Sequence, residues 1–181
     1  MGICAKPSRC FSNARRRRLR RSARRHTMLP TDGVNAGGSM DFEELTAGNL
    51  LFRMLDEEAR RRVLALGRVE TFRAGQVLIA QGAEDTDIFL VRRGTVDVQT
   101  QQEGFIVELS TLGPGSLFGE VAGVSGVRRT ATVTAREDGE LLRFPGRELV
   151  EELRRHPTAS RLLDAIVLHR AKDTIGKTFG E

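Results

Sequence analysis

Residues 113 to 135 read GPGSLFGEVAGVSGVRRTATVTA, a run in which glycines, one acid and two arginines lead into an alternating segment. It begins with Gly113-Pro114-Gly115, which predicts a type II turn with proline second and glycine third. The segment from Glu120 to Val124 has the length of one helical turn. From Thr130 to Ala135, threonine alternates with small apolar residues, which is typical of a strand with two different faces. The predicted order is turn, short helix, loop and strand.

The start of the short predicted helix is suited to an anion. Gly119 has no side chain, so the backbone there can approach a ligand closely. The first amides of a helix have no intrahelical partner, and they carry the positive end of the helix dipole. A phosphate group placed before Glu120 would meet these N–H groups. The segment therefore predicts a phosphate-binding site.

Strand alternation separates the two arginines. One face of the predicted strand carries only small apolar residues and must point into the protein: Ala131, Val133 and Ala135. The same alternation turns Arg129 inward and Arg128 outward. A buried guanidinium is costly unless it meets an anion. Arg129 therefore either binds a phosphate through its planar fork or pairs with an internal carboxylate such as Glu120. In the first case, Glu120 could accept a hydrogen bond from a ribose hydroxyl.

Two segments resemble the phosphate-binding cassette of the cyclic-nucleotide-binding domain family: Phe118-Gly119-Glu120-Val121-Ala122 and, six residues later, Arg129-Thr130-Ala131-Thr132-Val133. That family includes the regulatory subunits of cyclic-nucleotide-dependent protein kinases and the catabolite activator regulators. The upstream glycines also resemble the family's barrel signature: Gly75, Gln81-Gly82, and Gly94 after Phe89-Leu90-Val91. The similarity extends over residues 45–172.

The resemblance implies a role for six residues. Glu120 would hold the ribose 2′-hydroxyl, Arg129 the cyclic phosphate, and Thr130 would lie near the base. Backbone amides would assist at Gly119, Val121 and Ala122. The implied ligand is a purine cyclic mononucleotide, cAMP or cGMP, with no other cofactor and no metal.

The cassette departs from the family pattern at two positions. Gly123 stands where the family has a large aliphatic residue that couples the cassette to the following helices, and this weakens the expected coupling. Arg128 replaces a common proline. Thr130 resembles the cGMP-selective kinase sites, in which threonine favours guanine, and so gives a slight lean toward cGMP.

Hydrophobic residues alternate with a period of two from Val69 onward. Short alternating runs separated by glycine turns predict strands at residues 69–72, 77–80, 88–91, 95–99, 105–109 and 140–144. No helix long enough for a parallel crossover lies between them. Short strands at this spacing are typical of a β-sandwich or barrel. We therefore predict a mainly β fold with flanking helices: an antiparallel β-roll that resembles a jelly-roll barrel.

Helical periodicity flanks the strands on both sides. Before them, a helix is predicted with Asp56 as its N-cap and Gly67 as its end. After them, a first helix follows Gly146, and Pro157 begins a second one. The second helix carries an apolar stripe: Leu162, Leu163, Ile166 and Val167. The stripe fits packing against the barrel, a dimer contact, or a lid over a ligand, and its spacing does not choose among them.

Basic residues are concentrated at the start of the chain. Residues 1–40 hold ten basic residues and one acid, Asp32, although the net charge of the whole chain is only +5. The remaining residues are net acidic, which disfavours nucleic acid as a partner of the folded body. We predict a disordered basic tail and linker at 1–40, a cyclic-nucleotide-binding domain at 41–175, and a C-terminal tail at 176–181.

The basic tail has several interpretations. A block of like charge is most often a solvated tail, and Met28 or Met40 could be the true start. The block could also bind nucleic acid or an anionic membrane, or act as a targeting peptide. Met1-Gly2 and Cys4 hint at acylation, but Lys6 breaks the myristoylation pattern, and no apolar signal core follows the arginines. The two cysteines form no disulfide framework and fit free thiols in the cytoplasm.

These features together predict a stand-alone regulatory sensor in the cytoplasm that binds the nucleotide and signals to an effector protein through its C-terminal helices. A homodimer is a further candidate. No apolar run could span a membrane. About nine residues follow Lys172, too few for a DNA-binding domain. The alternative is a degenerate domain that binds proteins without a ligand. An enzyme is disfavoured because no catalytic constellation is visible and the histidines are scattered: His26, His156 and His169.

Overall fold

The computed structural model describes residues 48–102 and 104–179. All of them belong to one compact unit. The predicted basic tail at 1–40 and residues 180–181 lie outside the described residues, so the predicted domain boundaries stay predictions. In the described part of the chain, no helix is long and apolar enough to cross a membrane.

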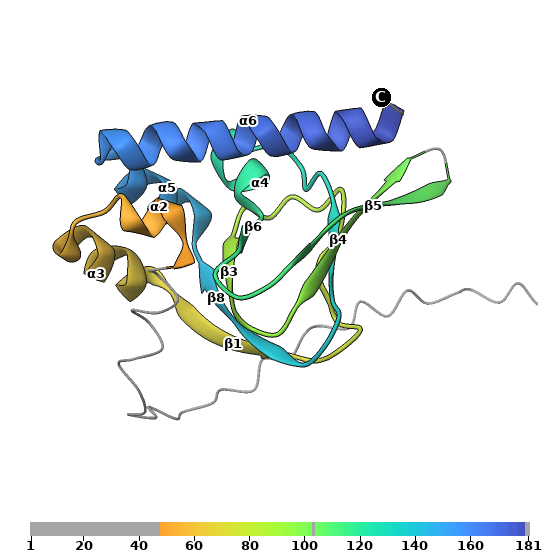
Figure 1. The fold of residues 1–181 in the computed structure, drawn as a ribbon, viewed down its shortest axis with the longest axis horizontal. Coiled ribbons are helices and arrows are strands. Elements are labelled where there is room, and N and C mark those ends of the chain that lie inside the picture. Colours follow the sequence, from red (N-terminus) through yellow and green to blue (C-terminus); the bar gives the residue numbers. More distant parts are fainter. Residues whose placement is uncertain (1–47, 103, 180–181) are drawn as a thin grey trace, which may run out of the picture. The chain divides into compact units, whose positions relative to one another are not determined.

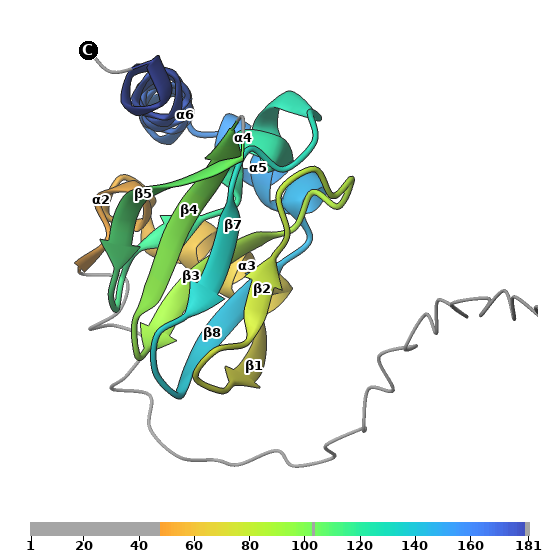
Figure 2. The same cartoon turned by 90° about the vertical axis from the view of Figure 1, so that its right-hand side faces the viewer.

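Eight antiparallel strands form two four-stranded sheets (Figures 1 and 2). The first sheet has the order β1 (Arg68–Phe72), β8 (Gly139–Phe144), β3 (Ile88–Arg93) and β6 (Leu117–Phe118). The second has the order β2 (Val77–Ile79), β7 (Thr132–Ala135), β4 (Val96–Gln102) and β5 (Phe105–Leu112). The predicted antiparallel β-roll is confirmed. The two sheets remain separate and do not close into a barrel.

Two hydrophobic clusters hold the roll together. One fills the space between the sheets and includes Phe72, Phe89, Phe118, Val133 and Leu141. The other lies between the first sheet and the helices and includes Phe52, Ile88, Phe144, Leu149 and Leu163. Successive residues of β3 feed the two clusters alternately, because successive side chains of a strand point to opposite faces.

The helices cover one side and one end of the roll (Figure 1). They are α2 (Leu50–Arg53), α3 (Glu57–Leu66), α4 (Glu120–Ser125), α5 (Gly146–Arg154) and α6 (Pro157–Phe179). Asp56 caps α3 by accepting a hydrogen bond from the Ala59 amide at 2.7 Å, and Gly67 ends it. Pro157 begins α6, and the predicted turn of helix after Gly119 is α4. These predicted helix starts are therefore confirmed.

Two details of the strand prediction were wrong. Leu117–Phe118 forms β6, a strand too short for alternation to reveal. The strand predicted from Thr130 begins only at Thr132. The predicted turn at Gly115 is consistent with its left-handed φ of 81° and with a hydrogen bond from the Ser116 amide to the Gly113 carbonyl.

Candidate functional site

A cavity of about 280 Å³ lies where α4, the inner face of the second sheet and α6 meet. All six predicted site residues line it: Gly119, Glu120, Val121, Ala122, Arg129 and Thr130. Its apolar walls include Ile79, Phe118 and Val133, and α6 contributes its roof. The volume is near the lower end of the roughly 300–1,000 Å³ typical of small-molecule pockets. The fold therefore brings the predicted residues together, while their ligand-binding roles stay a prediction.

Arg129 is almost fully buried, with 3% of its surface exposed, whereas Arg128 is exposed. The Nε of Arg129 donates to the Asp85 carboxylate at 3.1 Å, and the Nη2 of Arg129 donates to the same oxygen. Nη1 donates to the Gly119 carbonyl at 2.9 Å, and Nη2 donates also to the Asp87 carbonyl at 2.7 Å. The inward direction that alternation predicted is correct. The internal carboxylate that meets Arg129 is Asp85.

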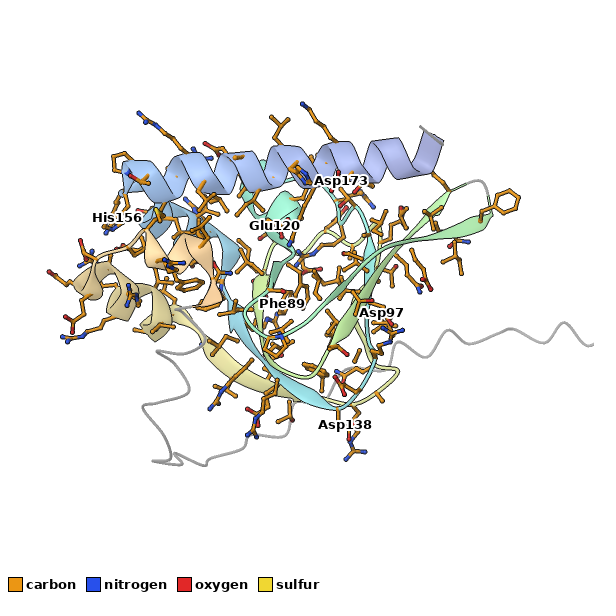
Figure 3. All side chains as sticks on the ribbon, viewed as in Figure 1. Phe89, Asp97, Glu120, Asp138, His156 and Asp173 are labelled. Atoms are coloured by element: carbon orange, nitrogen blue, oxygen red, sulfur yellow. The ribbon has the colours of Figure 1, made fainter. Side chains whose placement is uncertain are left out.

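Glu120 is the most deeply buried acid of the site, with 1% of its surface exposed. Its partner comes from α6: Arg170 Nη1 donates to Glu120 Oε2 at 2.9 Å and to the Leu117 carbonyl at 2.6 Å. Figure 3 shows Glu120 on α4 beneath α6. A buried carboxylate needs such a partner, because an uncompensated buried charge is costly. The contact ties the C-terminal helix directly to the cassette.

Gly119 has the left-handed φ of 84°, which favours glycine. A Cβ atom at this position would lie 2.6 Å from Arg129 Nη1 and 2.8 Å from the Asp87 carbonyl oxygen. The missing side chain therefore lets the backbone approach the guanidinium. The predicted close approach of a ligand to Gly119 stays a prediction, and in this structure the group beside its backbone is the guanidinium of Arg129.

Gly123 is also required by packing. A Cβ atom there would lie 2.7 Å from the Ile88 side chain and 3.0 Å from the Thr86 carbonyl oxygen. A Cβ on Gly146, the first residue of α5, would lie 3.5 Å from the Gly123 Cα. Two glycines thus let α4 rest directly on β3 and α5. The neighbouring Val124 packs against the hydrophobic cluster between the first sheet and the helices, called here the helix-side cluster.

Several residues that line or support the cavity were missed by sequence reasoning. Asp85 and Asp87 precede β3, and no sequence signal relates them to Arg129, which lies more than forty positions later. From α6 come His169, Arg170, Asp173 and Thr174. Arg170 and Thr174 continue the helical spacing of the stripe that holds Leu163 and Ile166, so that periodicity could have placed them on the inner face. His169 pairs with Asp173 at 3.0 Å.

In the described ranges, no group of three or more His, Cys, Asp or Glu side chains is arranged to hold a metal ion. The polar groups of the cavity are instead two guanidinium groups, two carboxylates, an imidazole, the hydroxyl groups of one serine and two threonines, and the start of α4. Such a set can hold an anion and hydroxyl groups together.

Comparison with known proteins identifies the family that this chain resembles in sequence. A family model described as "Cyclic nucleotide-binding domain" matches residues 69–156. The cAMP-dependent protein kinase regulatory subunit of Debaryomyces hansenii is 32% identical over 110 residues, which cover 60% of this chain and 23% of that protein. The corresponding subunit of Dictyostelium discoideum is 33% identical over 125 residues, which cover 66% of this chain and 37% of that protein. The chain therefore spans well under half the length of these relatives.

Solved structures share the fold. The Thermus thermophilus catabolite activator protein superimposes with a TM-score of 0.60 and 30% identity, over 68% of this chain and 58% of that chain. The regulatory domain of Toxoplasma gondii PKA, crystallised with cAMP, gives a TM-score of 0.59 at 23% identity, over 67% of this chain and 46% of that chain. The second likeness shows the fold alone.

Proposed function

Because this chain matches the cyclic nucleotide-binding domain family over residues 69–156, we propose that this protein is a regulatory sensor. It binds a cyclic purine mononucleotide and signals to a partner protein through α6. The observation that carries the proposal is a buried arginine, Arg129, in the wall of a cavity that also holds a buried carboxylate, Glu120. The proposed role is regulation and not catalysis.

The phosphate is assigned to Arg129 and the start of α4. The guanidinium has five N–H groups in a planar fork, and it lies beside the first amides of α4. Asp85 accepts two of those N–H groups, but its side chain is 49% exposed, so it can turn into solvent. A phosphate that enters the cavity would then replace the Asp85 carboxylate at the guanidinium of Arg129, which stays buried. Charge-assisted bonds of this kind are about twice as strong as neutral ones.

The ribose is assigned to Glu120, whose carboxylate holds α6 through Arg170. A ribose hydroxyl that donates to Glu120 leaves its charge unchanged but occupies carboxylate lone pairs next to those that Arg170 uses. A ligand in this position therefore alters the α4–α6 contact at its α4 end. This gives the nucleotide a direct route to the helix that would contact the effector.

Guanine is our choice of base. Thr130 and Asp173 line the same cavity. A carboxylate only accepts hydrogen bonds, and guanine offers it two neighbouring donor groups, N1–H and N2–H₂, whereas adenine offers one amino group. The curated relatives named above are cAMP-dependent, so preference for guanine would distinguish this chain from them.

Isothermal titration calorimetry with cAMP and cGMP tests the proposal. We expect binding of at least one nucleotide, and loss of about 2–5 kcal/mol of binding free energy in Arg129→Ala, as for truncation of a buried charge pair. Arg128→Ala is the matched control, because the Arg128 side chain is 69% exposed and pairs with Glu84 on the surface.

Absence of nucleotide binding would favour the alternative function, a degenerate domain that binds proteins without a ligand. Its specific support is that Arg129 already meets protein acceptors on Nε, Nη1 and Nη2. If neither nucleotide releases heat or raises the Tm of the wild-type protein, the sensor proposal is wrong and Arg129 is a structural residue.

A further inference from the structure

Asp87 contacts two arginines through its two ends. Its backbone carbonyl accepts a hydrogen bond from Arg129 Nη2 at 2.7 Å. Its carboxylate Oδ2 accepts from Arg143 Nε at 2.6 Å and pairs with Arg143 Nη2 at 2.5 Å. Asp87 therefore joins Arg129, the residue proposed to bind the phosphate, to Arg143, which lies outside the cassette.

Arg143 lies on β8, the strand between β1 and β3. It is directly opposite Phe89 of β3, on the same face as Leu141, which is buried between the sheets. Its side chain is 37% exposed, so it lies at the edge of this interior and not within it. Burial by itself lowers the pKa of Arg143, but the hydrogen bond and charge of Asp87, with a smaller contribution from Glu70, raise it above its ordinary value.

The two arginines also share an aromatic neighbour. The guanidinium carbon of Arg129 lies 5.8 Å from the centroid of the Phe89 ring, and that of Arg143 lies 6.0 Å from it. The Phe89 ring stacks on Phe118 with 5.1 Å between centroids, and Phe118 lines the cavity. The position of Arg143 is thus linked to the cavity wall by a polar route and an aromatic one.

We propose that Arg143 is a positioning residue for Arg129 and acts through Asp87; this inference rests on the proposed function, since it assigns Arg129 to the phosphate. Arg143 holds the Asp87 carboxylate on the far side of the chain, so that only the carbonyl of Asp87 faces Arg129. Without Arg143, Asp87 carries an unpaired carboxylate beside a buried cation. Coulomb attraction draws that carboxylate toward Arg129, where it competes with the phosphate.

A double-mutant cycle on the full chain tests the link. Arg143→Ala is measured in the wild-type and Asp87→Asn backgrounds by calorimetry with cAMP and cGMP. We expect roughly tenfold weaker binding in the wild-type background, within the range of interaction energies found between residues of one hydrogen-bond network. In the Asp87→Asn background the same change costs less than about twofold, because coupled residues are not additive. Equal losses in both backgrounds, or no loss in either, would overturn the proposal.

Two further variants separate positioning from general damage. Arg143→Lys keeps one charged contact with Asp87 and should recover part of the affinity. Arg136 directly follows β7 and forms an ion pair with Asp97. Arg136→Ala removes this ion pair and should leave nucleotide affinity unchanged. Loss of affinity in Arg136→Ala equal to that in Arg143→Ala would identify a general effect of losing a surface arginine and count against Arg143.

A measurement without nucleotide keeps this inference distinct from the proposed function. The Nε–H resonance of Arg129 is assigned in ¹⁵N-edited NMR spectra by its loss in Arg129→Lys. It should shift in Arg143→Ala and stay in place in Arg136→Ala. If the wild-type protein binds no nucleotide, the sensor proposal fails, while this resonance still reports the link. A resonance that does not move in Arg143→Ala removes the link itself.

Discussion

Arg129 is the residue at which strand alternation gave the correct side-chain direction outside a strand. The strand β7 starts only at Thr132, yet the Arg129 carbonyl accepts from the Gly82 amide at 2.8 Å and its amide donates to the Ala83 carbonyl at 2.9 Å. These bonds continue the pairing of β2 with β7 and keep residue 129 extended. Alternation holds wherever the backbone is extended and paired, which is why Arg129 is buried and Arg128 is exposed.

Asp173 tests the choice of base at the residue scale. Asp173→Asn replaces one acceptor oxygen by a donor that faces the donors of guanine. We expect the ratio of cGMP to cAMP affinity to fall by about tenfold or more, since a two-point contact with a base is worth about 1–3 kcal/mol of discrimination. Competition calorimetry with both nucleotides measures this ratio.

Asp164→Asn on the same helix serves as the matched control. Asp164 is exposed and its nearest basic partner is Arg154 at 3.9 Å, away from the cavity. If the affinity ratio is equal in Asp173→Asn and the wild type, Asp173 does not read the base.

At the scale of elements, α6 makes two kinds of contact, core packing and a polar contact at the cavity, and its apolar stripe alone did not distinguish them. Leu163 packs into the helix-side cluster, and Arg170, about two turns later on the same side, reaches Glu120. The first half of α6 therefore belongs to the core, while residues between His169 and Thr174 line the cavity, and Figure 3 shows Asp173 on this part of α6. Of the three interpretations of the stripe, packing holds for the first half, and the lid and the homodimer stay predictions.

Arg170→Ala tests how α6 is held. Loss of a hydrogen bond between charged groups costs about 1.5–3 kcal/mol, so we expect local opening to become easier and amide exchange in the second half of α6 to rise by about tenfold or more. Hydrogen–deuterium exchange with mass spectrometry measures the exchange rate of each peptide along α6. Arg161→Ala, an exposed position on the same helix, should leave exchange unchanged. Unchanged exchange in Arg170→Ala would mean that the apolar stripe alone holds α6.

At the scale of the whole molecule, a buried acid joins helix α5 to helix α3. Glu152 of α5 is 7% exposed, and its Oε1 accepts from Arg62 Nε of α3 at 2.7 Å. Arg155 Nη1 donates to Oε2 at 3.0 Å, and His156 lies 3.9 Å from Oε1. The hydrogen bond from Arg62, helped by the charges of Arg62, Arg155 and His156, outweighs burial and lowers the pKa of Glu152 below its ordinary value.

This lowered pKa predicts how stability depends on pH. A carboxylate with a lower pKa in the folded state stabilises the fold fully above its unfolded pKa of about 4.3, and that contribution is lost as the pH falls through the folded value. We expect Glu152→Gln to lower the Tm at pH 7 and to have a smaller effect on Tm well below pH 4, where wild-type Glu152 is itself protonated. Thermal melts across this pH range measure the difference.

Glu151→Gln, an exposed neighbour on α5, provides the comparison. Its Tm should stay close to that of the wild type at every pH. An equal loss of Tm at pH 7 and at low pH in Glu152→Gln would show that packing, and not the charge of Glu152, is what the substitution removes.

The sequence by itself determined the elements that depend on neighbouring residues. Strand alternation, the Asp56 cap, the Pro157 start and the turn at Gly115 are local, and the structure contains them. The order Gly119-Glu120 followed by Arg129-Thr130 was enough to indicate the cassette and the family, because these residues lie close together along the chain.

The tertiary structure alone decided which residues meet across long sequence separations. Asp85 and Asp87 meet Arg129 from a loop more than forty positions earlier, and Arg170 meets Glu120 from fifty positions later. No periodicity relates such positions, because their contacts depend on how the two sheets and α6 pack. The same holds for Gly123, whose closeness to Ile88 and Gly146 follows from the docking of α4 and not from its own segment.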